Sequence, residues 1–129
     1  MCVSYIAVLC FACATSNVVV PEGLKPMELI QRAQEASDRN RYGLALQYYE
    51  ALLERNSHDS FYVCTAEYEI AFIHYKQKKY PLARTRLNAL LERYAVPDAS
   101  NLPPQFKLLA EKVLERIDER ENKRRLFSR

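Results

Sequence analysis

The stretch RYGLALQYYEALLER at residues 41–55 returns in altered form as KYPLARTRLNALLER at residues 79–93. Both copies have a tyrosine three residues before an alanine, and both end in the same five residues, Ala-Leu-Leu-Glu-Arg. Corresponding residues are 38 positions apart throughout. Self-similarity at a period of about 20–50 residues is typical of proteins built from stacked structural repeats. This repeat therefore decides the fold class.

Apolar residues at three- and four-residue spacing predict helices over residues 26–39, 42–55, 60–77 and 80–94. Pro26 and Pro81 fall in first turns, where the missing N–H costs little. Asp59 or Ser60 is expected to cap the third helix. The predicted core positions of the first three helices are Leu29, Ala33, Ala36, Ala45, Leu46, Tyr49, Leu52, Leu53, Val63, Ala66, Ile70, Ala71 and His74. The sequence thus predicts two antiparallel helix pairs.

A fifth helix is predicted over residues 104–125, after a loop at residues 95–103. It is expected to cover the exposed end of the second helix pair. Its apolar face comprises Phe106, Leu109, Ala110, Val113, Leu114 and Ile117. Beyond Asp118 the apolar pattern stops, and a basic tail is expected at residues 126–129. The cations at 123–125 and Arg129 either touch anionic lipid headgroups or, as we favour, form a solvated helix end.

The repeat resembles the tetratricopeptide family, whose unit is an antiparallel helix pair of roughly 34 residues. The stretch IAFIHYKQKKY at residues 70–80 fits the family pattern closely. The family's repeat-packing positions correspond to Ala33, Tyr42 and Ala45 in the first copy and to Ala71, Tyr80 and Ala83 in the second. The resemblance implies an all-α domain over residues 26–125, with two repeats and a C-terminal capping helix. The 38-residue period is similar to that of helical-repeat bacterial envelope lipoproteins, including the D component of the outer-membrane β-barrel assembly machine.

Residues 3–14 are apolar or small, and no charge occurs before Glu22. Such a run is too short to cross a hydrocarbon core of roughly 30 Å as a helix, but it suits a signal peptide. Its end, Ala12-Cys13 followed by small polar residues, resembles a bacterial lipoprotein signal. The resemblance implies a signal peptide at residues 1–12, acyl chains such as palmitate on Cys13, and a tether at residues 13–25. The chain would then be a membrane-anchored lipoprotein facing the periplasm; the alternatives are an uncleaved anchor or a cytosolic protein.

Composition and motifs point away from catalysis. A net charge of +3, mixed evenly along the chain, indicates no nucleic-acid partner. No phosphate-binding loop, activated nucleophile or pair of carboxylates on an apolar face is apparent. After cleavage before Cys13, Cys64 would be the remaining thiol, so no internal disulfide is expected. We therefore expect no enzyme activity, no cofactor and no metal site.

In the tetratricopeptide family the first helix of each pair lines a concave groove. By position, the partner-binding residues would be Ile30, Gln34 and Ser37 in the first pair and Tyr68, Phe72 and Tyr75 in the second. The three aromatics share one helix face and offer an apolar strip, unless the fifth helix or a neighbouring helix covers them. The leading hypothesis is an adaptor that binds another envelope protein or peptide segment. The alternatives are a binding protein for a small hydrophobic ligand and a homo-oligomeric dimerisation scaffold.

Overall fold

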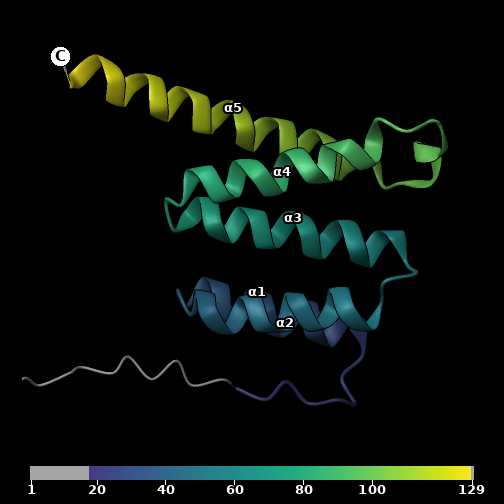
Figure 1. Cartoon of the computed structure of the whole chain (residues 1–129). Coiled ribbons are helices and arrows are strands. Elements are labelled where there is room, and N and C mark those ends of the chain that lie inside the picture. The colour runs from purple at the N-terminus through teal and green to yellow at the C-terminus, as the bar shows by residue number, and fades with distance from the viewer. Residues whose placement is uncertain (1–17, 129) are drawn as a thin grey trace, which may run out of the picture.

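The computed structural model describes residues 18–128, and within this range the protein is all-helical, with no strand. Five α-helices follow one another along the chain: α1 Pro26–Asp38, α2 Tyr42–Arg55, α3 Ser60–Lys76, α4 Tyr80–Tyr94 and α5 Pro104–Phe127. Consecutive helices run antiparallel and form a stack of pairs, with α5 across the end (Figure 1). The predicted all-α class, with antiparallel helix pairs and a fifth helix packed on the second pair, is confirmed.

The helix boundaries follow the sequence closely. Helices α2 and α4 have the predicted bounds, and α1 and α3 each end one residue earlier than expected. The Asp59 side chain accepts a hydrogen bond of 2.9 Å from the backbone N–H of Phe61, so Asp59 is the cap of α3. Two features differ from the prediction: the loop contains a short 3₁₀-helix, η1 Pro97–Asn101, and α5 continues to Phe127 into the expected tail.

The turns inside the two pairs have the same geometry. Asn40 and Lys78, which are 38 residues apart, are the two non-glycine residues with positive φ in residues 18–128, at 57° and 61°. The next residue in each turn donates a backbone hydrogen bond back across the helix end, from Arg41 to the Ala36 carbonyl at 2.8 Å and from Lys79 to the His74 carbonyl at 2.9 Å. This six-to-one bond with a left-handed residue is the Schellman ending of a helix. The sequence repeat is therefore also a repeat in backbone structure.

Two hydrophobic clusters share α3. The first joins α1 and α2 to Ala66, Ile70 and Ile73 of α3, and the second joins Cys64 and Ala71 of α3 to α4 and α5. Helix α3 is apolar almost all round, as expected for a helix that is buried on both sides. Both clusters, with the half-buried residues packed against them, are built from residues between Val20 and Ile117.

Small residues lie where the paired helices meet. Ala33, Ala45, Ala71 and Ala83 are fully buried, Tyr80 is buried and Tyr42 is half-buried. All predicted core positions of α1 to α3 are buried or half-buried. On α5 the predicted apolar face is also covered, except that Leu109 remains 38% exposed. The helical period therefore located much of the core, but Cys64, Ile73, Leu87 and Leu90, which are almost fully buried, were not among the predicted positions.

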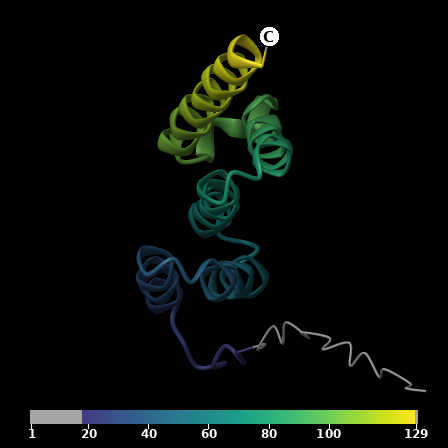
Figure 2. The ribbon, with the colours of Figure 1, turned by 90° about the vertical axis from the view of Figure 1, so that its left-hand side faces the viewer.

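Polar contacts hold α5 and α4 in place at their edges. Arg84 of α4 binds Asp118 at 2.6 Å and Glu121 at 2.8 Å on α5. The Tyr94 hydroxyl at the end of α4 donates to the Pro103 carbonyl at 2.7 Å. These pairs are partly exposed, so each contributes little, and apolar packing supplies most of the stability. Figure 2 shows α1 and α5 on the same side of the stack, with α3 between them.

The matched turns predict unequal effects of glycine. Lys78→Gly should raise the free energy of unfolding by about 0.5–1 kcal/mol, because glycine adopts positive φ without a steric cost and lysine does not. Asn40→Gly should change the free energy of unfolding by only about a few tenths of a kcal/mol, because asparagine already tolerates this conformation. Urea denaturation followed by circular dichroism measures both. An equal gain at the two sites, or a loss at Lys78, would contradict this assignment of the turns.

Candidate partner-binding face

Tyr68, Phe72 and Tyr75 of α3 form a stack of rings, here called the aromatic ladder. The ring centroids of Tyr68 and Phe72 are 5.8 Å apart with an interplanar angle of 11°, and those of Phe72 and Tyr75 are 5.7 Å apart with 17°. Residues three and four apart lie on one helix face, which explains the contact. The structure thus brings together the three aromatics that the sequence predicted as one strip.

Helix α5 covers one edge of the aromatic ladder. The Phe106 ring lies 6.0 Å from the Tyr68 ring, and the Arg120 guanidinium lies over Tyr75 at 5.6 Å. Burial, with a smaller effect of the Glu69 charge, raises the pKa of Tyr68 to about 12. Tyr68 is therefore largely a core residue. Phe72 and Tyr75 stay half-buried and keep ring surface that a partner can reach.

On α1, the three predicted binding residues differ in accessibility. Ile30 and Ser37, like Tyr68, are only 7% exposed, whereas Gln34 is exposed. The Ser37 hydroxyl accepts a hydrogen bond from the Lys76 ammonium of α3. This contact places the face of α1 that carries residues 30, 34 and 37 toward α3. Burial leaves Ile30, Ser37 and Tyr68 little surface for a partner, so the accessible predicted residues are Gln34, Phe72 and Tyr75.

Lys76 links α1 to the aromatic ladder. Its ammonium lies 5.3 Å from the Phe72 ring centroid and 5.4 Å from that of Tyr42, in addition to its bond to Ser37. Each ring attracts the cation through its electron-rich face. Lys76 was not among the residues predicted from the sequence, although its spacing of four from Phe72 on a helix was a usable signal.

Glu69 is a second polar group beside this face that was not predicted. Burial raises the pKa of the half-buried Glu69 carboxyl, the charge of Lys76 opposes this shift, and the charge of Asp38 adds to it. The face between α1 and α5 therefore combines aromatic rings with two cations, Lys76 and Arg120, and one partly desolvated acid. Such a mixture suits a protein segment that carries both apolar and polar groups.

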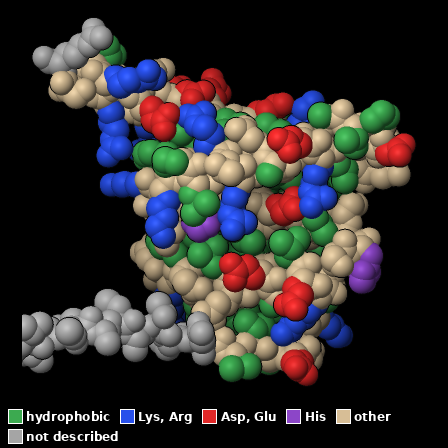
Figure 3. All heavy atoms as spheres, in the orientation of Figure 1, with side chains coloured by type: hydrophobic (Ala, Val, Ile, Leu, Met, Phe, Trp, Pro, Cys, Tyr) green, Lys and Arg blue, Asp and Glu red, His purple; other side chains and the backbone are tan. Residues whose placement is uncertain are grey.

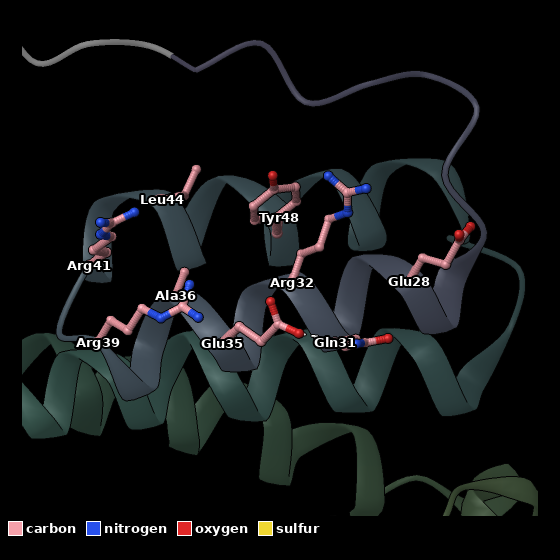
Figure 4. Close-up of a pocket in the computed structure, with 9 residues that line it drawn as sticks. All are labelled: Glu28, Gln31, Arg32, Glu35, Ala36, Arg39, Arg41, Leu44 and Tyr48. Atoms are coloured by element: carbon pink, nitrogen blue, oxygen red, sulfur yellow. Dashed lines mark hydrogen bonds between the residues drawn. The ribbon is translucent and has the colours of Figure 1, made fainter.

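A separate hollow of about 370 Å³ lies on the outer side of the first helix pair (Figure 4). Its lining comes from α1 and the start of α2 and comprises Glu28, Gln31, Arg32, Glu35, Ala36, Arg39, Arg41, Leu44 and Tyr48. The Gln31 amide donates to Glu35 at 3.0 Å along one wall. Cations and acids alternate in this lining, so the hollow selects no particular charge.

Burial shifts the pKa of two potentially reactive side chains, Cys64 and His74. Burial raises the pKa of the fully buried Cys64 thiol, with the Tyr94 hydroxyl opposing the shift, which makes Cys64 a poor nucleophile. Burial lowers the pKa of His74, which packs at the end of α3 beside Gln77. Within residues 18–128, no three His, Cys, Asp or Glu side chains are grouped to hold a metal ion. None of the helices described is both long and apolar enough to cross a membrane.

Comparison with known proteins adds one relative. A stretch of 109 residues is 35% identical to an uncharacterized protein of Treponema pallidum (strain Nichols), and the match spans 83% of this chain but only 44% of that protein. No family model matches the chain, and no solved structure matches it. The relative carries no assigned role, so the functional argument depends on the site itself.

Proposed function

We propose that the chain is a membrane-tethered interaction module of the bacterial envelope, which binds a partner protein or peptide between α1 and α5. The observation that carries this proposal is the half-buried surface of Phe72 and Tyr75 on that side of α3. Aromatic side chains supply large contact area at low entropic cost and are enriched at protein interfaces. Gln34 and Lys76 beside the rings provide polar contacts that fix the register of a bound segment.

A protein segment suits this face better than a small hydrophobic ligand. Small ligands generally need a cavity that buries about 70–90% of their surface. Here Phe106 of α5 already occupies the Tyr68 end of the aromatic ladder, so the accessible rings form an open strip. A helix or extended peptide can lie along such a strip without being enclosed.

The tetratricopeptide assignment belongs to the same proposal. Its support is the 38-residue repeat, the matching turns at Asn40 and Lys78, and the buried alanines where the paired helices meet. The family groove would correspond to the side of the stack where α1, α3 and α5 lie together (Figure 2).

The membrane tether is proposed from the sequence around Cys13, which lies outside the described residues. We expect a palmitate analogue fed to the producing bacterium to label the native chain and Cys64→Ala, but not Cys13→Ala. Cys64 is the matched control because its thiol is buried. Label that persists in Cys13→Ala, or a native chain that takes up no label, would remove the lipoprotein assignment. The cellular location of the interaction module would then be unassigned.

Site-specific crosslinking tests the binding face. A photoreactive residue at the exposed Gln34 should give an adduct with a partner, whereas one at the exposed Asn88 of α4 should not. Phe72→Ala with Tyr75→Ala should reduce the Gln34 adduct about tenfold or more, since buried aromatics commonly contribute over 1 kcal/mol each to an interface. Leu82→Ala on α4 is the control for losing apolar surface.

The mass of the adduct identifies the partner class. An adduct of twice the chain mass would favour a dimerisation scaffold over an adaptor. Equal adducts at Gln34 and Asn88, or an adduct insensitive to the double alanine variant in chains that remain helical, would contradict a partner site on this face.

A further inference from the structure

One end of the molecule is strongly basic. The α1–α2 turn, the α3–α4 turn and the C-terminal end of α5 all lie at this end (Figure 1). Positively charged side chains gather along the same edge, below and around the end of α5 (Figure 3). The cations from these three segments are Arg39, Arg41, Lys76, Lys78, Lys79, Arg120, Lys123, Arg124 and Arg125. They are scattered in sequence, and only the antiparallel fold assembles them.

Two adjoining cavities open between α5 and the α3–α4 turn, with volumes of about 460 Å³ and about 300 Å³. They share Lys78, Tyr80 and Arg120 in their walls. The other lining residues are Lys123, Arg124, Phe127 and Ser128 in the larger cavity and Tyr42, Tyr75 and Lys76 in the smaller. Neither lining contains an acidic residue, in contrast to the mixed hollow on α1. We call these two cavities together the basic recess.

The cations of the basic recess are not neutralised by the fold. None of its five Lys and Arg side chains forms an ion pair within residues 18–128. Of the three acids in the same part of α5, Asp118 and Glu121 pair instead with Arg84 of α4, and Glu119 is absent from the lining of the basic recess. A concave site lined by charges of one sign concentrates the positive potential and attracts anions.

Exposed apolar side chains accompany the cations. Leu126 and Phe127, in the last turn of α5, are 77% and 81% exposed, and Phe127 also borders the basic recess. Cations at a helix C-terminus stabilise the helix dipole, but this does not account for two large apolar side chains in water. Apolar groups among cations are the combination that suits a membrane interface, where phosphates lie next to hydrocarbon.

We infer that the basic recess and the tip of α5 form a second site, which docks on the phosphate groups of anionic lipids at a bilayer surface. Lys78, Arg120, Lys123 and Arg124 contact the phosphates, while Leu126 and Phe127 enter the boundary between headgroups and acyl chains. The site adjoins the partner face, because Tyr75 and Lys76 line its smaller cavity. Its larger cavity contains neither of them, and Gln34 and Phe72 are absent from both linings. It also requires no lipid on Cys13, since every residue it uses lies between 42 and 128.

Vesicle sedimentation tests this inference with a chain of residues 18–129, which retains both hydrophobic clusters and lacks the N-terminal segment. We expect it to bind vesicles of phosphatidylcholine with about one third phosphatidylglycerol, and to bind pure phosphatidylcholine much less. Lys123→Glu with Arg124→Glu should lower the partition coefficient about tenfold or more. Lys107→Glu with Lys112→Glu, at exposed positions nearer the start of α5, makes the same change in net charge and should leave binding nearly intact.

The apolar contribution has its own control. Leu126→Ser with Phe127→Ser should lower the partition coefficient roughly threefold or more. Leu108→Ser, at another exposed position on α5, should leave the partition coefficient nearly unchanged. Circular dichroism confirms that each variant folds. The inference is overturned if the chain fails to bind anionic vesicles, if the two charge-reversed variants bind equally, or if the cations at 123 and 124 support binding to duplex DNA but not to vesicles.

Discussion

The structure depends on the burial of α3 on two sides. Ile70 and Ile73 pack with α1 and α2, while Cys64 and Ala71 pack with α4 and α5. A helix that is apolar around its whole circumference is stable in water only when other helices cover it on all sides. Neither helix pair can therefore complete its core alone. The fifth helix meets the same requirement, because it covers apolar surface of the second cluster that α4 leaves exposed.

Two-sided burial also shapes the surface that remains for binding. Between α1 and α5, helix α3 keeps a side that reaches solvent, where Phe72 and Tyr75 stack and Lys76 crosses to Ser37. The raised pKa of Glu69 has the same origin, since the carboxyl is partly desolvated by the packing around α3. The proposed binding face and the core thus use one helix, and the antiparallel turns that close this core also bring the basic recess together.

The sequence predicted the elements well because their signals are local. The repeat located α2 and α4 to the residue, and Asp59 capped α3 as its position suggested. Burial between elements was harder to predict: Ile30 and Ser37 lie on the predicted face, yet packing covers them. For the cations at 123–125, lipid contact was predicted only as the less favoured alternative to a solvated helix end. The basic recess as a whole could not be predicted, because its cations come from segments more than 40 residues apart. Helix α5 continued past 125 to Leu126 and Phe127, because leucine has a high helix propensity even where it is not buried.

The most direct test of the central role of α3 is native-state hydrogen exchange in Ile70→Ala, because Ile70 belongs only to the first cluster. If α3 couples the clusters into one cooperative unit, the most protected amides of α2 and of α4 should lose the same free energy of protection, about 2–5 kcal/mol. A loss confined to α1 and α2, with α4 and α5 unchanged, would show that the two clusters unfold independently and would contradict this account.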